Sequence, residues 1–260
     1  MEQPKRQPRK PGWRFALLAL VLAVAISAVV RSLWVDIFFI PSASMEPLLH
    51  TGDRIVVART GFQAKPLGRG DVVVFDGRGS FAPLNSGNGP VVDALAEAGR
   101  WLGLAGSDTT YVKRVIGLPG DRVQMKEGLL HINDVPVKRE RLSDFVGEDP
   151  CGSDAQARVK RWKETLPNGV SYETLDCVDV GFYDNTNVYT VPAGHFFMMG
   201  DNRDNSTDSR VLSAVGYVPF QNIIGRAQMI FFSIAEGEHA WMFWRWPTAV
   251  RWNRLFSIVR

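Results

Sequence analysis

Two serines and a distant lysine are the side chains of this sequence with the clearest capacity for covalent chemistry. Ser42 and Ser44 lie two residues apart in the run IPSASMEPLL at residues 40–49, so they share a face of an extended backbone. Pro41 and Pro47 flank them and favour a rigid, non-helical turn. A serine hydroxyl becomes a nucleophile only where a neighbouring group accepts its proton, so the chain must also supply a base.

Lys113 is the best candidate for that base. It lies in the run YVKRVIGLPGD at residues 111–121, where alternation predicts a strand closed by a turn. A lysine with the ordinary pKa of about 10.4 is protonated at pH 7 and cannot accept a proton. Burial between apolar strand neighbours would lower that pKa by several units. The alternative interpretation is a strand lysine whose stem packs on the sheet while its ammonium group reaches water.

A third run, GDNRDNSTDSR at residues 200–210, is dense in Asp, Asn and Ser. This composition is typical of a loop whose side chains hydrogen-bond to their own backbone. A Ca²⁺ site is the alternative, but the acidic spacing differs from that of the EF-hand loop and no glycine lies in its middle. We therefore expect neither a metal nor a cofactor.

Together these runs resemble one family, the bacterial type I signal peptidases. The serine box of that family corresponds to PSASMEP at residues 41–47, its lysine box to YVKRVIGLPGD at residues 111–121, and its third box to GDNRDNSTDSR at residues 200–210. Their order, and their position behind an apolar segment, also agree. The resemblance thins out across residues 77–109 and 138–187.

The resemblance implies a membrane-anchored serine endopeptidase that removes signal peptides from exported precursors after small residues, in the Ala-x-Ala pattern. Ser44 would be the nucleophile and Lys113 the general base. The backbone N–H of Ser44 would bind the oxyanion, with the Ser42 hydroxyl as a second donor. Ala43 stands where the family more often has glycine, so a positive φ there would be strained.

The resemblance also implies roles for residues around the dyad. Ser206 would hydrogen-bond to Lys113 and orient it. Asp208 and Arg210, two apart on one face, would form an ion pair that braces the third box. A shallow apolar pocket would exclude large side chains and hold an extended peptide as an added strand. Its lining would comprise Ile40, Pro41, Met45, Leu49, Tyr111 and Val112.

The segment before the serine box predicts a membrane anchor. Residues 1–14 form a basic, proline-containing tail, and residues 15–35 are predicted to be a transmembrane helix flanked by Trp13 and Trp34. The basic flank predicts a cytoplasmic N-terminus and a single pass through the bacterial inner membrane, with the catalytic domain on the periplasmic side. The alternative is a cleaved signal peptide and a secreted protein that begins near residue 29.

The rest of the chain predicts a mostly β fold. We expect a coiled antiparallel sheet core over residues 36–137 and 188–260, interrupted by a surface excursion over residues 77–109 with a short helix near residues 91–102. An inserted polar subdomain is expected over residues 138–187. Within the core, strands are predicted over residues 53–59, 71–76, 187–192, 195–199 and 222–233, and a hairpin over residues 124–137.

Both cysteines, Cys151 and Cys177, lie in the predicted insertion. In an exported domain they predict a disulfide, and closing a loop of this length would stabilise the fold by roughly 3 kcal/mol. The alternative is two free thiols. A cysteine-based metal site lacks further ligands nearby.

Charge and composition indicate which classes of partner the protein binds. The 260-residue chain has a net charge of +3, part of it in the N-terminal tail, which predicts no nucleic-acid binding. Precursor proteins and the lipid bilayer are the expected partners. Tryptophans and arginines mix over residues 241–260, an arrangement that suits either a membrane interface or ordinary core packing.

Other functions remain open on the sequence alone. A histidine-based triad would draw on His50, His131, His195 or His239, although no Gly-x-Ser-x-Gly elbow surrounds Ser44. A self-cleaving Ser-Lys protease would use the same dyad on its own chain. A membrane-anchored, non-catalytic β binding module would keep the fold and need neither Ser44 nor Lys113.

Overall fold

The computed structural model describes residues 13–33, 35–59, 66–77, 110–146, 150–152, 159–238, 240 and 242–260. Several expectations lie outside these residues. They concern residues 1–12 of the basic tail, residues 78–109 of the surface excursion with its helix, and the side chains of Trp34, His239 and Trp241.

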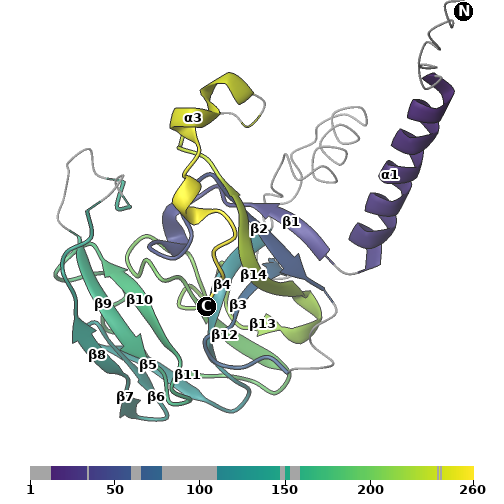
Figure 1. Ribbon diagram of the computed structural model, residues 1–260. Coiled ribbons are helices and arrows are strands. Elements are labelled where there is room, and N and C mark those ends of the chain that lie inside the picture. Colours follow the sequence, from purple (N-terminus) through teal and green to yellow (C-terminus); the bar gives the residue numbers. More distant parts are fainter. Residues whose placement is uncertain are drawn as a thin grey trace, which may run out of the picture.

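A seven-stranded antiparallel sheet forms the body of the protein (Figure 1). Strand β14 lies between β2 and β3, so a late segment completes a sheet that begins near the start of the chain. This arrangement confirms the expected mostly β, antiparallel fold. In spatial order the strands are β1 (Val35–Phe39), β2 (Asp53–Ala58), β14 (Ile223–Ser233), β3 (Val72–Asp76), β4 (Thr110–Gly117), β12 (His195–Met199) and β13 (Val218–Pro219).

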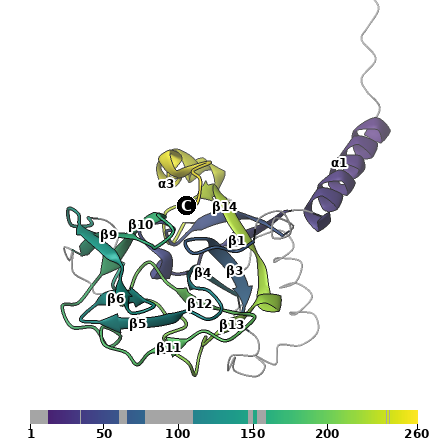
Figure 2. The ribbon, with the colours of Figure 1, turned by 90° about the horizontal axis from the view of Figure 1, so that it is seen from below.

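A four-stranded sheet follows directly from β4 through a tight turn (Figure 2). The predicted hairpin over residues 124–137 forms most of it. Its two turns take positive φ angles, among them at Gly128 and Asn133, which tolerate this conformation. The strand predicted over residues 187–192 is reduced to two paired residues. The order is β11 (Tyr189–Thr190), β5 (Arg122–Lys126), β6 (Leu129–Ile132) and β7 (Val135–Pro136).

The predicted insertion forms a three-stranded sheet that shares a core with the rest of the domain. Leu166 and Tyr172 are buried in the same apolar cluster as Val123 of β5 and Phe197 of β12. The insertion is therefore packed against the other sheets rather than separate from them. Its strands are β8 (Lys138–Arg141), β9 (Lys160–Thr165) and β10 (Ser171–Asp176), in the order β10-β9-β8.

Helix α1 (Trp13–Leu33) stands away from the sheets in both ribbon views (Figures 1 and 2). It ends before the predicted limit of residue 35, because Val35 already pairs with Ala58 in the sheet. No helix in the described part of the chain has the length and apolar character that a membrane span requires. The remaining helical elements are short: η1 (Ala43–Met45), η2 (Phe220–Asn222), η3 (Phe243–Arg245), α3 (Trp246–Ala249) and η4 (Trp252–Arg254).

Candidate active site

Ser44 lies in the turn η1, which is separated from strand β1 by residues 40–42. The N–H of Glu46 donates to the Ala43 carbonyl at 3.1 Å, and the side chain of Met45 is buried in the core. Ala43 is not among the described residues with a positive φ angle, so the strain considered for this position does not arise. A backbone hydrogen bond and the buried Met45 side chain thus hold the turn that carries Ser44, shortly after the edge strand β1.

Lys113 projects from β4 toward this serine. Its Nζ lies 2.5 Å from Ser44 Oγ, and its side chain is only 3% exposed, which excludes the interpretation that its ammonium group reaches water. Burial lowers the pKa of Lys113 to about 8; Asp208 and Asp201 oppose this shift and Arg210 adds to it. About one tenth of such lysines are neutral at pH 7 and able to accept a proton.

Asp208 and Arg210 form the ion pair expected within the third box. The Arg210 guanidinium donates to both carboxylate oxygens of Asp208, each at 2.8 Å. The same carboxylate accepts the Gly200 N–H at 3.0 Å. Burial raises the pKa of Asp208, but the attraction of Arg210 and these hydrogen bonds outweigh it, so the net pKa lies below its ordinary value. The aspartate is therefore a permanent negative charge near Lys113.

The expected hydrogen bond between Ser206 and Lys113 is absent from the structure. Ser206 Oγ is buried and has no hydrogen-bond partner among the described residues. Close packing against Gly200 sets its position instead: a Cβ built on Gly200 would lie 2.2 Å from Ser206 Oγ and 2.5 Å from the Ser44 carbonyl oxygen. Ser206 therefore packs against Gly200 and makes no hydrogen bond to Lys113.

Asn202 contacts the serine turn directly, and our sequence analysis did not single it out. Its backbone N–H donates to the Ser44 carbonyl at 3.2 Å, and its side chain donates to the Ala43 carbonyl at 3.3 Å. The sequence signal was the position of Asn202 inside the third box. Asparagine is so common in loops that its residue type alone did not distinguish it.

The six predicted pocket residues are only partly brought together. Ile40, Met45 and Leu49 lie in one buried cluster, and Val112 packs against it. Tyr111 belongs to a different cluster, where its ring stacks on Phe75 at 5.7 Å. The remaining residue, Pro41, is exposed. Three of the six side chains thus form the floor beneath the serine turn rather than an open surface.

The described histidines have partners other than Ser44. His50 pairs with Glu46 at 3.3 Å, while the rings of His131 and His195 each contact a backbone carbonyl two residues earlier. None of these three hydrogen-bonds to Ser44. Within the described residues, no group of three or more His, Cys, Asp or Glu side chains is arranged to hold a metal ion.

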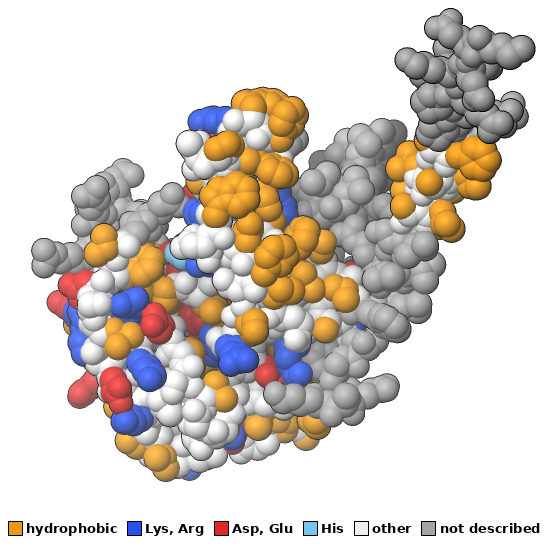
Figure 3. All heavy atoms as spheres, in the orientation of Figure 1, with side chains coloured by type: hydrophobic (Ala, Val, Ile, Leu, Met, Phe, Trp, Pro, Cys, Tyr) orange, Lys and Arg blue, Asp and Glu red, His pale blue; other side chains and the backbone are white. Residues whose placement is uncertain are grey.

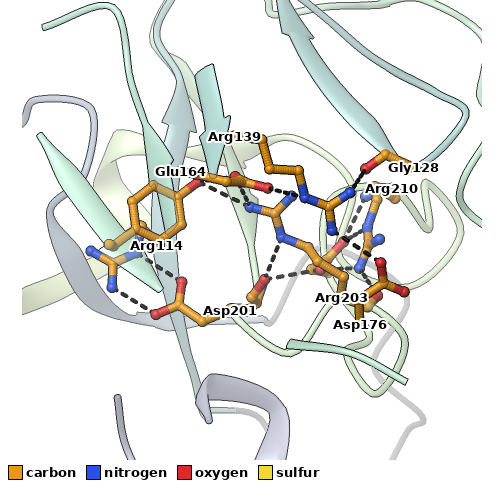
Figure 4. Close-up of polar contacts among 11 residues, drawn as sticks. Arg114, Gly128, Arg139, Glu164, Asp176, Asp201, Arg203 and Arg210 are labelled. Carbon is orange, nitrogen blue, oxygen red and sulfur yellow. Dashed lines mark hydrogen bonds and ion pairs between the residues drawn. The ribbon is translucent and has the colours of Figure 1, made fainter. Parts of the chain in front are cut away.

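A buried network of charges connects the third box to the inserted sheet (Figure 4). Arg114 pairs with Asp201 through two hydrogen bonds of 2.8 and 2.6 Å. Arg203 donates to Glu164 of β9 at 2.6 Å and to the Tyr172 hydroxyl of β10 at 3.0 Å. Because an unpaired buried charge is costly, these contacts hold the third box against the insertion.

Comparison with known proteins identifies the family. The sequence profile described as "Signal peptidase, peptidase S26" matches residues 13–232. The chain belongs to this family. A signal peptidase I of Rickettsia typhi is 34% identical over 228 residues, covering 84% of this chain and 79% of the relative. A signal peptidase I of Rickettsia bellii is 32% identical over 256 residues, covering 92% of this chain and 83% of that relative.

Membership of the signal peptidase family makes this chain a serine peptidase. The matched span includes Ser44, Lys113 and the whole third box. Among solved structures, a crystal structure of a signal peptidase I from Enterococcus faecalis V583 is similar at 22% identity with a TM-score of 0.29, covering 62% of this chain and 97% of that one.

Proposed function

We propose that this peptidase removes signal peptides from exported precursors, with Ser44 as nucleophile and Lys113 as general base. The observation that carries the proposal is the 2.5 Å separation of Lys113 Nζ and Ser44 Oγ at a lysine whose pKa is lowered to about 8 by burial. At pH 7 a larger fraction of lysines with this pKa is neutral than of exposed lysines, and only the neutral amine can accept a proton from serine.

Peptide cleavage would follow in two stages. Ser44 Oγ attacks the scissile carbonyl carbon while its proton passes to neutral Lys113. The C–N bond then breaks, and Lys113 returns that proton to the leaving amine of the mature protein. A water attacks the resulting ester with Lys113 again taking the proton. The ester C–O bond then breaks while Lys113 gives that proton to Ser44 Oγ, so the signal peptide leaves with a new carboxyl group and the free serine is restored.

The oxyanion of each tetrahedral intermediate would be bound by the backbone N–H of Ser44 and the hydroxyl of Ser42. Ser42 is exposed, and its Oγ lies 3.3 Å from Ser44 Oγ, within reach of an oxygen that develops beside the nucleophile. Losing one such donor costs about 3–4 kcal/mol of transition-state stabilisation in other serine peptidases.

Cleavage after small residues, in the Ala-x-Ala pattern, is the specificity that we propose. Among the described residues β1 pairs on one side only, with β2, so an extended peptide can add to its other edge. Ile40, Met45 and Leu49 are buried in one apolar cluster, and we expect this floor to leave little depth beside Ser44. Steric exclusion at such a floor favours alanine over larger side chains.

Attachment to the bacterial cytoplasmic membrane, with the catalytic domain on the outer side, is the localisation that we propose. Helix α1 exposes a series of large apolar side chains, including Phe15, Leu18 and Leu22. A second apolar surface gathers around α3 (Figure 3) and includes Phe243, Trp244 and Trp252. Exposed apolar surface of this extent is typical of interaction sites, and its mixture of Trp and Arg suits lipid headgroups.

Flotation with vesicles of a phosphatidylethanolamine and phosphatidylglycerol mixture tests the attachment. Full-length protein is expected to float with the vesicles, and a Leu18→Lys, Leu22→Lys variant to float less. Equal flotation of both proteins would rule out α1 as the anchor.

Cleavage of a precursor with an Ala-x-Ala site by detergent-purified full chain tests the activity. Wild-type protein is expected to cut once, after the final alanine, whereas folded Ser44→Ala and Lys113→Ala variants are expected to be inactive. Activity in either variant would overturn the dyad. An inert wild type would instead favour the binding module, and cutting only within its own chain would favour the self-cleaving protease.

A further inference from the structure

Asn202 holds both peptide groups that flank Ser44. The residue is fully buried, at 0% exposure. Its side-chain amide donates to the Ala43 carbonyl at 3.3 Å, and its backbone N–H donates to the Ser44 carbonyl at 3.2 Å. These two carbonyls belong to the peptide groups on either side of the Ser44 Cα. One residue of the third box therefore contacts the nucleophile's backbone on both sides.

Because a peptide group is planar, a hydrogen bond to the Ala43 carbonyl also determines where the Ser44 N–H, the expected oxyanion donor, points. In a trans peptide the Ala43 carbonyl and the Ser44 N–H lie in one plane and point in opposite directions. A hydrogen bond that fixes the carbonyl therefore also fixes the direction of the N–H. The Asn202 N–H also fixes the peptide group that contains the Ser44 carbonyl. With both groups fixed, the Ser44 Cα–Cβ bond has a defined direction, and Oγ points toward Lys113.

We propose that Asn202 is a positioning residue for peptide hydrolysis, which aims the Ser44 N–H at the oxyanion and Ser44 Oγ at Lys113. This inference rests on the proposed function of Ser44. Asn202 acts only through the backbone of the serine turn, so it contributes to the transition state more than to substrate binding.

The inserted sheet holds Asn202 in turn. Leu175 of β10 forms a parallel bridge with Asn202: its N–H donates to the Asp201 carbonyl and its own carbonyl accepts the Arg203 N–H, both at 2.9 Å. On the other side, the Asn202 amide donates to the Pro150 carbonyl at 2.7 Å. Pro150 precedes Cys151, which is bonded to Cys177 just beyond β10. Hydrogen bonds from two segments of the insertion therefore hold Asn202 in place.

Asn205 provides a matched control. Its side chain donates to the same Pro150 carbonyl at 2.8 Å, and it is exposed, with no hydrogen bond to the serine turn among the described residues. Asn205→Ala removes one amide from the same loop and the same acceptor. Unlike Asn202→Ala, it keeps the hydrogen bond from the Asn202 side chain to the Ala43 carbonyl.

The experiment measures kcat and KM on an Ala-x-Ala precursor, and inhibition by a peptide aldehyde that ends in alanine. The aldehyde adds to Ser44 and creates the same oxyanion as the substrate. For Asn202→Ala we expect kcat to fall about tenfold to a hundredfold, an unchanged KM, and aldehyde binding weakened by a similar factor. Asn205→Ala is expected to keep kcat within about twofold, as for substitutions without a direct role.

The aldehyde separates positioning from a merely structural role. A variant that is simply less folded has fewer active molecules, which lowers the apparent kcat but leaves aldehyde affinity unchanged. That result, or wild-type kcat in Asn202→Ala, would overturn the inference. If Asn202→Ala does not fold, Asn202→Ser is measured against the same expectations. An active Ser44→Ala variant would instead refute the proposed function, so the two failures are distinguishable.

Discussion

Gly200 and Ser206 are in such close contact that a methyl group on Gly200 would lie 2.2 Å from Ser206 Oγ and 2.5 Å from its Cβ. The same methyl group would lie 2.5 Å from the Ser44 carbonyl oxygen. The backbone of the third box thus packs directly on the serine turn, so we expect a displacement of this loop to displace Ser44.

Gly200→Ala is expected to lower kcat/KM at least about a hundredfold, because a displacement of about 1 Å at the reacting groups has that effect. Precursor cleavage and thermal unfolding measure activity and folding separately. Gly68→Ala is the control, since a Cβ there meets only Asp71 Oδ2, at 4.0 Å. Retention of more than half of wild-type activity by Gly200→Ala would contradict the close packing.

The pH dependence of kcat/KM should report Lys113. We expect activity to rise with pH through an apparent pKa near 8, the value to which burial lowers the pKa of this lysine. Asp208 raises the Lys113 pKa, so Asp208→Asn should move the rising limb to lower pH. A limb that stays in place or moves upward in this variant would show that another group titrates.

Lys113→Met should stabilise the protein at neutral pH. Because burial lowers the Lys113 pKa from 10.5 to about 8, the unfolded state binds more protons between these values, and wild-type stability rises with pH across that window. Below pH 8 the wild type therefore lacks about 3 kcal/mol of stability that the variant keeps. Guanidinium unfolding should show a smaller difference in free energy of unfolding between Lys113→Met and wild type at pH 10 than at pH 7. An equal difference at both pH values would contradict the prediction.

Glu164→Gln should destabilise the fold by about 3–5 kcal/mol, because it leaves the buried Arg203 without its charged partner. Glu173→Gln is the matched control on the neighbouring strand. Glu173 forms a more exposed pair with Arg161 at 3.4 Å, and its loss should change the free energy of unfolding by no more than about 0.5 kcal/mol. If Glu164→Gln also cost no more than about 0.5 kcal/mol in urea unfolding, the buried pair would add no measurable stability.

Removing the disulfide between Cys151 and Cys177, by Cys151→Ala with Cys177→Ala, should lower the free energy of unfolding by about 3 kcal/mol, since it releases the loop between them. Urea unfolding with and without dithiothreitol measures the cost. Wild-type protein should become less stable with the reductant and the double variant should not change. A reductant effect of equal size on both proteins would exclude the disulfide as its cause.

Much of the fold could be predicted from local patterns of apolar residues along the sequence. Strand β12 has the predicted bounds, and β14 begins one residue later than predicted. Four consecutive buried apolar side chains follow His195 in β12, and glycines bound the strand at residues 194 and 200, a pattern typical of a buried strand. The strand predicted over residues 187–192 is reduced to β11, because only Tyr189 and Thr190 pair with β5, and the position of a partner strand is not encoded in the local sequence. Burial of Leu166 and Tyr172 in the shared core was hidden by the polar residues around them.

The sequence by itself determined that Ser44 and Lys113 were the candidates for nucleophile and base, because few side chains can act in these roles and because three runs of the chain resemble the boxes of the signal peptidases. Only the tertiary structure decided which neighbours support them. In it, Asn202 is hydrogen-bonded to the serine turn, Ser206 Oγ has no hydrogen-bond partner among the described residues, and Lys113 is buried. Hydrogen bonds and burial depend on distances between segments far apart in the chain, and these distances exist only once the sheets have packed.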